Sequence, residues 1–402
     1  MSLRPPGTEP SLTVAQAHAE PELSPDAARR TAGLRTGWTT GTCASAAAKA
    51  AVEGLMTGRC PSSVEVGLPG GRRVTFAVEP SPGAPHRAVV VKDAGDDPDC
   101  TDRARMTATA SWSAPPPTEL RLVAGEGVGV VTRPGLGLRV GAPSITAVPQ
   151  RMIAAAVAET GTHGRAVTVT FSVPGGEAMA ARTSNSRLGI VGGISILGTS
   201  GVVRPFSTAA YRASVVQQVD VAAAQGERLI VLATGARSDA AAQRLRPDLS
   251  DVCFVEVGDY TGVALRRAAG SGMAGALWVG MAGKIAKLAA GVLMTHFHRS
   301  AVDGDVLAAA ARAAGAPAEV VAAATETATA RHFFEVCVER GVRAPLELLC
   351  EQAVAACRAH VSGALGVEVV MVDFEGAEVV ARAGVAMTEA GRGGNGRGGE
   401  GR

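Results

Sequence analysis

Three threonines, Thr39, Thr40 and Thr42, are well placed in this sequence to bind an anion, because they surround one glycine at the start of an alanine-rich segment. The first turn of a helix has backbone N–H groups without partners and a partial positive charge, and adjacent hydroxyls add further donors. A carboxylate or a phosphate is therefore one candidate ligand. The alternative is an ordinary helix cap, although three threonines exceed what a cap requires. Cys43 has no defined base near it in the sequence, so we expect a packed thiol.

A second polar segment begins at Lys92 and Asp93, directly after a predicted strand. It places four acidic residues and one lysine in the sequence KDAGDDPD (92–99). These charges suit the orientation of a cation or of the polar rim of a substrate, but their spacing is not that of an EF-hand loop. A solvated turn is the alternative.

Two glycine-rich segments follow. The first, residues 125–135, contains Arg133, as expected where backbone N–H groups and a guanidinium together hold a carboxylate. The second, residues 187–201, is followed by the sequence RPF beginning at Arg204. Glycines among β-branched residues are typical of a backbone that passes close to a bulky or flat group. We expect this segment to form a cleft wall, with an interdomain hinge as the alternative.

Glycine-containing turns follow three predicted strands in the second half of the chain. Gly235 follows the first strand, Asp259 and Gly262 follow the second, and Gly283 follows the third. Ligands of open parallel sheets bind at the carboxyl ends of the strands, where these turns would meet. Asp259 lies 24 residues after Gly235, close to the separation at which an acid commonly binds ribose hydroxyls. An adenosine-containing cofactor is therefore predicted, with purely structural turns as the alternative.

Three further motifs fail on their context. Residues 270–275 spell GxGxxG, but they follow a predicted helix and precede a strand, the reverse of a dinucleotide fingerprint. Residues 280–284 lack the first glycine and the final Ser or Thr of a P-loop. His296 and His298 have no defined third ligand, so no metal site is predicted.

The pattern of elements predicts two domains of different architecture. Residues 34–205 form an α+β domain, in which a helix at 42–52 begins at Thr40 or Thr42 and stops at Gly54. Its predicted strands are 64–68, 73–78, 87–92 and 166–173. Residues 206–385 form an α/β domain with a mainly parallel sheet and a helical C-terminal part. Its predicted strands are 228–233, 253–257, 276–279 and 367–372, and its predicted helices are 208–225, 238–245, 261–269 and 284–293.

Composition narrows the classes of function. The 402 residues carry a net charge of +2, too small a field to favour nucleic acid as a partner. Seven cysteines, an odd number without a CxxC pair, favour a reducing cytoplasm. We expect no signal peptide and no membrane span. Residues 1–33 and 386–402 are predicted to be disordered flanks.

Six blocks of this sequence resemble the CbiD family. They are TGWTTGTCASAAAKAA (36–51), VKDAGDDPDCTD (91–102), GEGVGVVTRPGLGLRVGAP (125–143), SVPGGE (172–177), SRLGIVGGISILGTSGVVRPFS (186–207) and GKIAKLAAGVLMTH (283–296). The resemblance implies methylation of carbon 1 of cobalt-precorrin-5B by S-adenosylmethionine, giving cobalt-precorrin-6A in anaerobic cobalamin biosynthesis. Cobalt is then part of the substrate only. The family also implies an N-terminal domain like the second domain of ribosomal protein S5, followed by an α/β domain.

That function organises the candidate residues. Methyl transfer from a sulfonium needs alignment and desolvation more than a nucleophile, which agrees with the lack of an evident nucleophile–base pair. The substrate carries acetates and propionates, and the residues expected to bind them are Thr39, Thr40, Thr42, Lys92, Arg133 and Arg204. The residues expected to approach the cofactor are Gly235, Asp259, Gly262 and Gly283. Asp93 or His296 would accept a proton if the reaction requires one.

Two other functions stay open. One is a small-molecule kinase, because S5-like domains also occur in such enzymes. The other is a carrier that binds the corrinoid without altering it. Neighbouring enzymes of the pathway are further candidate partners.

Overall fold

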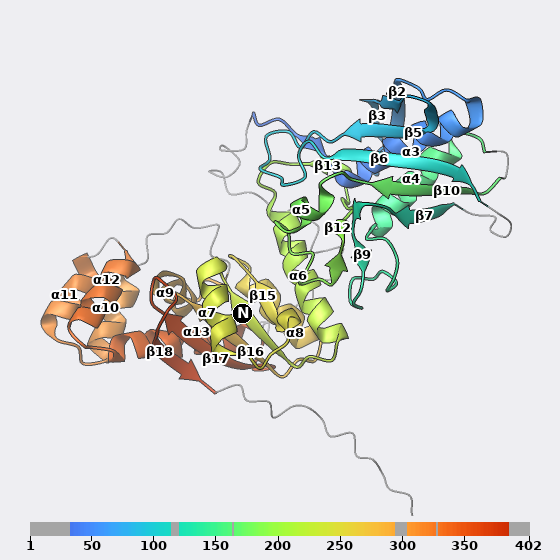
Figure 1. Cartoon of the computed structure of the whole chain (residues 1–402). Helices are drawn as coiled ribbons and strands as arrows, with labels where there is room; N and C mark the ends of the chain where they lie inside the picture. Colours follow the sequence, from blue (N-terminus) through green and yellow to red (C-terminus); the bar gives the residue numbers. More distant parts are fainter. Residues whose placement is uncertain (1–32, 114–119, 163–164, 294–303, 327–328, 386–402) are drawn as a thin grey trace, which may run out of the picture. The chain divides into compact units, whose positions relative to one another are not determined.

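The computed structural model describes residues 33–113, 120–162, 165–293, 304–326 and 329–385 (Figure 1). These residues form two compact units, the first ending at Tyr211 and the second beginning at Arg212. The predicted disordered flanks, apart from Gly33, and His296 and His298 lie outside the described residues.

The first unit is built on a five-stranded sheet with strand order β4-β5-β6-β10-β7. Its strands are β4 (Glu79–Ser81), β5 (Ala84–Val91), β6 (Arg105–Trp112), β7 (Arg121–Ala124) and β10 (Val167–Ser172). Only the pairing of β10 with β7 is parallel among these strands. A separate hairpin joins β2 (Ser63–Gly67) to β3 (Arg73–Ala77), and helices α3 (Thr40–Thr57) and α4 (Ala147–Ala158) complete the core.

Helix α3 lies against this sheet because its buried positions are occupied by small residues, mainly alanine. The predicted stop at Gly54 is wrong: the helix continues to Thr57 and ends at Gly58, which has the left-handed φ of 74° typical of a C-cap. Gly54 serves packing instead. A Cβ at this position would lie 1.7 Å from the carbonyl oxygen of Pro85, so only glycine lets β5 approach the helix.

Three pairs of two-residue strands gather the glycine-rich segments of the first unit. β1 (Gly37–Trp38) pairs with β13 (Val202–Val203). β8 (Gly127–Val128) pairs with β12 (Gly193–Ile194), and β9 (Val130–Val131) pairs with β11 (Ile190–Val191). Segments far apart in the sequence are thereby joined backbone to backbone, and the short helix α5 (Gly176–Ala180) contacts the pair of β8 and β12.

The second unit contains a sheet of order β15-β14-β16-β17-β18. The strands are β14 (Leu229–Ala233), β15 (Phe254–Glu256), β16 (Gly275–Gly280), β17 (Gly366–Val372) and β18 (Val379–Gly384). The first four are parallel, which confirms the predicted βαβ arrangement, and β18, which was not predicted, closes one edge antiparallel to β17. The described chain is therefore a mixed α and β protein.

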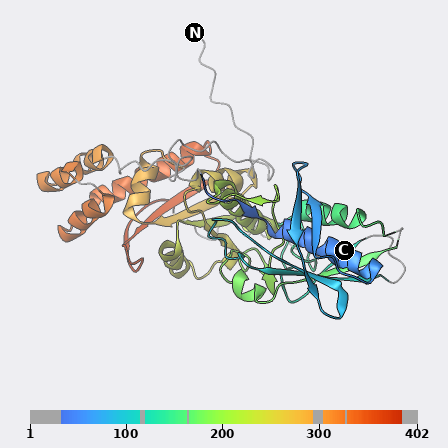
Figure 2. The ribbon, with the colours of Figure 1, turned by 90° about the horizontal axis from the view of Figure 1, so that it is seen from above.

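Alternation along the strands divides the core of this unit between two faces of the sheet. Ile230 and Leu232 belong to the larger cluster, whereas Val231 between them belongs to a smaller cluster with α7 (Ala236–Leu245). The larger cluster includes residues of α6 (Thr208–Ala224), α8 (Thr261–Gly270), α9 (Ala282–Ala289), α10 (Gly304–Ala313), α11 (Ala318–Glu326), α12 (Ala330–Glu339) and α13 (Ala344–His360). Figure 2 shows α10, α11 and α12 side by side at one end of this unit.

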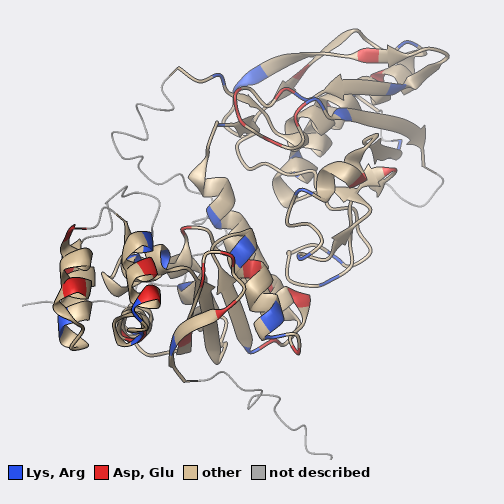
Figure 3. Ribbon diagram, turned by 60° about the vertical axis from the view of Figure 1, so that its left-hand side comes forward, with Lys and Arg blue, Asp and Glu red and all other residues tan. Residues whose placement is uncertain are grey.

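Positive and negative residues are interspersed over the ribbons of both units (Figure 3). Within the described part of the chain, no helix has the length and apolar character needed to cross a membrane.

Candidate functional site

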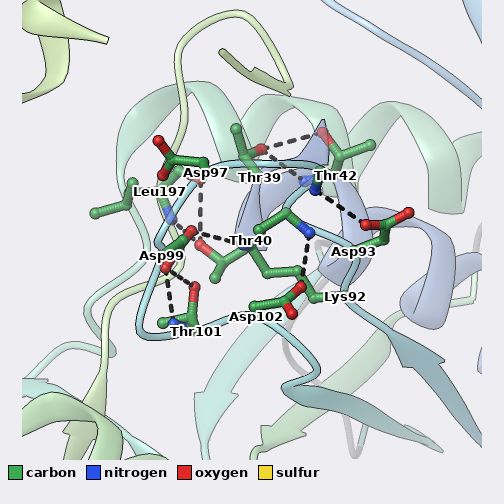
Figure 4. A network of polar contacts seen from close by, with 12 residues as sticks. Thr39, Thr40, Thr42, Lys92, Asp93, Asp97, Asp99, Thr101, Asp102 and Leu197 are labelled. Atoms are coloured by element: carbon green, nitrogen blue, oxygen red, sulfur yellow. Dashed lines mark hydrogen bonds and ion pairs between the residues drawn. The ribbon is translucent and has the colours of Figure 1, made fainter. Parts of the chain in front are cut away.

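The three threonines at the start of α3 form the centre of a polar network (Figure 4). The helix cap is Thr39, whose hydroxyl accepts a hydrogen bond of 3.2 Å from the Thr42 N–H, rather than the predicted Thr40 or Thr42. All three residues are buried, with exposed fractions of 7%, 4% and 0%. Their hydroxyls are therefore enclosed rather than presented to solvent.

These hydroxyls attach the second glycine-rich segment to the helix. The Thr40 hydroxyl accepts a bond of 2.9 Å from the Leu197 N–H and lies 3.1 and 3.2 Å from the carbonyl oxygens of Ser195 and Leu197. The Thr42 hydroxyl donates to the Gly201 carbonyl at 2.7 Å. The threonines thus fix the course of residues 195–201, and any direct bond to a ligand would have to compete with these bonds.

Lys92 lies in the same network but is already neutralised. It is 1% exposed, and its ammonium is 2.6 Å from the carboxylate of Asp99. Burial acts to raise the pKa of Asp99, but the charge of Lys92 and hydrogen bonds from Thr101 outweigh it, so the pKa is lowered. Lys92 therefore stabilises the acidic loop from within.

Asp93 is held by an ion pair with Arg35 and by a bond of 2.9 Å from the Gly95 N–H. The hydrogen bond from Arg35 is the main reason why the pKa of Asp93 is lowered. A carboxylate with a lowered pKa is a weak proton acceptor. Asp93 therefore fixes the backbone of residues 93–95 next to Arg35.

One contact that the sequence did not predict joins the acidic loop (residues 92–99) to Phe206, which follows the second glycine-rich segment. The Phe206 N–H donates to the Asp97 carboxylate at 2.8 Å, across 109 residues of chain. Burial raises the pKa of Asp97, with the neighbouring Asp99 adding to this rise. No local sequence pattern signals this contact, because its two partners lie on separate loops.

Arg133 packs directly over a glycine of the second glycine-rich segment. A Cβ on Gly189, which has a φ of +70°, would lie 2.5 Å from the Arg133 side chain. Beside it, the Thr132 hydroxyl donates to the Gly189 carbonyl at 2.7 Å. The glycines at 189 and 193 are explained by close approach of neighbouring chain, since a Cβ at Gly193 would lie 2.0 Å from the backbone of Gly127. The structure therefore brings Arg133 onto the same glycine-rich segment that the threonines hold.

An exposed arginine and exposed large apolar side chains lie on these two glycine-rich segments or on the residues that follow them. Arg204 is exposed, and its side chain makes no ion pair within the described residues. Among the described residues of the first unit, the large apolar side chains that are at least half exposed all lie here: Val140, Val191, Leu197 and Phe206. A hollow of about 520 Å³ is lined by Glu126, Gly127, Gly175, Gly176, Glu177, Ala178 and Ala181.

The second unit gathers the predicted cofactor residues at the carboxyl ends of neighbouring strands β15, β14 and β16. Asp259 forms an ion pair with Lys284 of α9, a partner that was not predicted. A Cβ at Gly235 or at Gly283 would meet no atom within 4 Å. Gly262 differs, because a Cβ there would lie 2.8 Å from His360. Gly235 and Gly283 therefore have open space beside them, Asp259 is polar and ion-paired, and Gly262 is packed against His360.

Other reactive groups are accounted for by burial. Cys43 is 0% exposed and burial raises its pKa to about 12, which confirms the packed thiol. Cys253, Cys337, Cys350 and Cys357 have pKa values raised to about 12 for the same reason. Across the described ranges, no three His, Cys, Asp or Glu residues gather as a metal site would require.

The fold and these sites define a two-unit protein of the α/β class. Its candidate ligand-binding elements are the hydrogen-bonded glycine-rich loops of the first unit and the turns at the strand ends of the second unit. Residues 27–205 match the CbiD family model, and residues 294–383 match the model described as CbiD, C-terminal domain. The chain belongs to the CbiD family.

Curated relatives agree with this assignment. A Salinispora arenicola protein named cobalt-precorrin-5B C(1)-methyltransferase is 55% identical over 371 residues, which are 91% of this chain and 97% of that protein. A Rubrobacter xylanophilus protein of the same name is 53% identical, over 90% of this chain and 94% of its own length. The crystal structure of an Archaeoglobus fulgidus cobalamin biosynthesis protein (CbiD) is 28% identical and has a TM-score of 0.37, covering 70% of this chain and 85% of that one.

Proposed function

We propose that this protein methylates carbon 1 of cobalt-precorrin-5B with S-adenosylmethionine, giving cobalt-precorrin-6A in anaerobic cobalamin biosynthesis. One observation carries the proposal: a relative that is 55% identical over 91% of this chain is named for that reaction. The architecture suits it, because a protein that aligns two bound reactants needs binding surfaces more than a nucleophile of its own.

The reaction is a displacement at a methyl group. A bond forms between the methyl carbon and carbon 1 of the macrocycle, the bond from sulfur to that methyl breaks, and the sulfur keeps the electron pair as a thioether. The sulfonium supplies the electrophile, so the work of the protein is orientation and exclusion of water. The described residues fit this division, since burial raises the pKa of the Cys43 and Cys350 thiols to about 12 and such thiols do not act as nucleophiles near neutral pH.

Gly235, Gly283 and Asp259 are the residues we assign to the cofactor. The first two leave open space at the carboxyl ends of β14 and β16, where a backbone can approach a ligand closely. Asp259 would bind ribose hydroxyls with Lys284 holding its carboxylate in place. Gly262 has a lesser part, because His360 already occupies the space above it.

Arg204 and Arg133 are the residues we assign to the carboxylates of the substrate. Arg204 is exposed, and the Arg133 side chain packs over Gly189 of the glycine-rich segment that precedes Arg204. Thr39, Thr40 and Thr42 act through the backbone of residues 195–201, and Lys92 acts through the acidic loop that it neutralises. The threonines and Lys92 are therefore positioning residues in this proposal.

Proton removal is the least constrained step. The lowered pKa of Asp93 leaves it charged but weakly basic, and His296 lies outside the described residues. Both stay predictions, to be separated by the pH dependence of turnover in Asp93→Asn and His296→Ala. The proposal also includes a likeness of the first unit to the second domain of ribosomal protein S5. It further includes transfer of the substrate from neighbouring pathway enzymes.

Transfer of label from S-[methyl-¹⁴C]adenosylmethionine to cobalt-precorrin-5B tests the function. Label in the corrinoid, together with S-adenosylhomocysteine as the second product, is the expected result. Binding of the corrinoid without transfer of label would overturn the proposal in favour of a carrier. A thermal shift with ATP and Mg²⁺, without one for S-adenosylmethionine, would overturn it in favour of a kinase.

A further inference from the structure

Phe206 has an unusual backbone conformation for a bulky residue. Its φ is 58°, and the other described non-glycine residues with positive φ are Arg103 and Ser362. A side chain with a Cβ is disfavoured in this region, so such a conformation persists only where the surrounding structure enforces it. Residues of this kind cluster at functional sites, which makes the purpose of the strain at Phe206 a question about function.

The surrounding structure shows what enforces the conformation. The carboxylate of Asp97 accepts the Phe206 N–H at 2.8 Å. On the preceding side Pro205 is buried, and the two-residue pairing of β13 with β1 fixes Val202 and Val203. Phe206 is therefore held on its N-terminal side by the carboxylate of Asp97 and by the buried Pro205.

This conformation holds the aromatic ring in solvent. Phe206 is 61% exposed, the largest exposed fraction among the large apolar side chains described in the first unit. Arg204, two residues earlier, is also exposed, while Pro205 between them is buried. The Ser207 N–H donates to the Arg204 carbonyl at 3.1 Å, which closes a turn with Pro205 at its second position and Phe206 at its third. A turn with positive φ at its third residue favours glycine there. The turn therefore explains the backbone conformation but not the phenylalanine, whose exposed ring contributes nothing to the core.

The ligand that suits an exposed ring beside an exposed guanidinium is a flat apolar molecule with an anionic rim. The ring offers a face for stacking, and the guanidinium binds a carboxylate in a planar, bidentate geometry. A corrinoid with acetate and propionate groups has both features. Its ring system is apolar and extended, and its edge is negatively charged.

We propose that Phe206 is a substrate-binding platform for the corrinoid ring and that Asp97 is its positioning residue, an inference that rests on the proposed function. Asp97 acts by fixing the backbone from which the ring projects. Arg204 supplies the charge that orients the ring edge.

The test compares two variants that both remove the ring. Phe206→Ala keeps a Cβ in the left-handed region, whereas Phe206→Gly relieves the strain. Both should raise the KM for cobalt-precorrin-5B and the Kd for cobyrinic acid, a stable corrin with free carboxylates, by about 3- to 10-fold, the scale of one aromatic contact. The KM for S-adenosylmethionine should stay unchanged. The Tm of Phe206→Gly should be higher than that of Phe206→Ala, because only glycine accepts this φ without strain.

Phe206→Trp and Val338→Ala serve as controls. The tryptophan variant keeps a stacking face and should retain affinity within about 2-fold. Val338 is 48% exposed on α12 of the second unit, and its truncation should leave corrinoid affinity unchanged. Unchanged corrinoid affinity in both Phe206→Ala and Phe206→Gly would overturn the platform. Turnover by the native chain decides the proposed function separately.

Asp97 is tested through its dependence on Phe206. Asp97→Ala should raise the corrinoid KM about as much as Phe206→Ala, while Asp97→Asn, which keeps an acceptor oxygen, should restore most of the affinity. In the double variant with Phe206→Ala, the loss of Asp97 should add nothing further, because the residue that it positions is gone. Additive losses in the double variant would overturn the positioning role.

Discussion

The acidic loop of the first unit and the strand-end turns of the second unit deal with polar groups in opposite ways. In the loop, Lys92, Asp97 and Asp99 are bonded to partners inside their own unit. At the strand ends, Gly235 and Gly283 present backbone next to open space. A loop whose charges are satisfied internally is rigid and shapes what lies above it, whereas an open backbone edge can receive a ligand directly. The difference indicates that substitutions in the loop act on stability and shape, and substitutions at the turns act on binding.

Lys92→Met should give the largest effect. It leaves the carboxylate of Asp99 without its cation in a partly buried position, and removing one partner of a buried pair costs about 3–5 kcal/mol. Urea unfolding at neutral pH measures this loss. Arg105→Met is the matched control, because Arg105 pairs with Glu79 where both side chains are about half exposed, 51% and 52%, and should lose less than about 1 kcal/mol. Equal losses in the two variants would contradict a rigid, internally satisfied loop.

Gly262→Ala and Gly283→Leu sharpen the comparison within the second unit. A Cβ at position 262 meets His360 at 2.8 Å, so this variant should lose about 1–3 kcal/mol of stability through overpacking. Gly283 lies in the first turn of α9 with no atom near its Cβ position, so leucine should be tolerated or mildly stabilising. It should still weaken S-adenosylmethionine binding at least about tenfold, which isothermal calorimetry measures. Retained affinity in a stable Gly283→Leu variant would remove this turn from the cofactor site.

Thr40→Val should cost about 1–3 kcal/mol, because the Leu197 N–H and the Ser195 carbonyl oxygen lose the Thr40 hydroxyl, while the Leu197 carbonyl keeps its bond from the Gly41 N–H. Corrinoid affinity should fall with it, since residues 195–201 lose their attachment to α3. Thr40→Ser keeps the hydroxyl and should recover both properties. If the valine variant kept full stability but lost affinity, the hydroxyl would be a direct ligand of the substrate, as first expected from the sequence.

Local patterns predicted the elements that depend on neighbours in sequence. The alanine run predicted α3. The alternation of strands and helices along the second unit predicted the parallel pairing of its strands. The end of α3 was misplaced because the role of Gly54 is set by Pro85 of β5, which the helix pattern does not contain. Strand β6 was not predicted, since its alternating Ala and Thr residues become a strand by pairing with β5 and β10 on both sides.

The candidate site shows the same limit. Thr39, Thr40 and Thr42 were recognised as unusual, but their partners at 195–201 are more than 150 residues away, so a ligand contact and a loop attachment could not be distinguished. The pairs Asp97 with Phe206 and Asp259 with Lys284 are likewise formed by the fold. Residue type and spacing indicate where polar chemistry gathers, and only tertiary contacts show which groups are already satisfied.

Glu159 provides the smallest and most specific test of the comparison, because its ion pairs are on the surface. Its carboxylate accepts hydrogen bonds from Arg73 and Lys49 at 2.7 to 2.9 Å. These bonds, mainly those from Arg73, lower its pKa from 4.5 to about 2. Because the pKa of Glu159 is lower in the folded state, its carboxylate stabilises the protein at pH values above the unfolded-state pKa of about 4.5. This stabilisation is lost as the pH falls from about 4.5 through about 2. Solvent screening keeps the effect below about 1 kcal/mol. Glu159→Gln should therefore reduce stability slightly at pH 6 and less at pH 2 in urea unfolding, and high salt should diminish the loss at pH 6. A larger loss than that of Lys92→Met would reverse the order expected for surface and buried pairs.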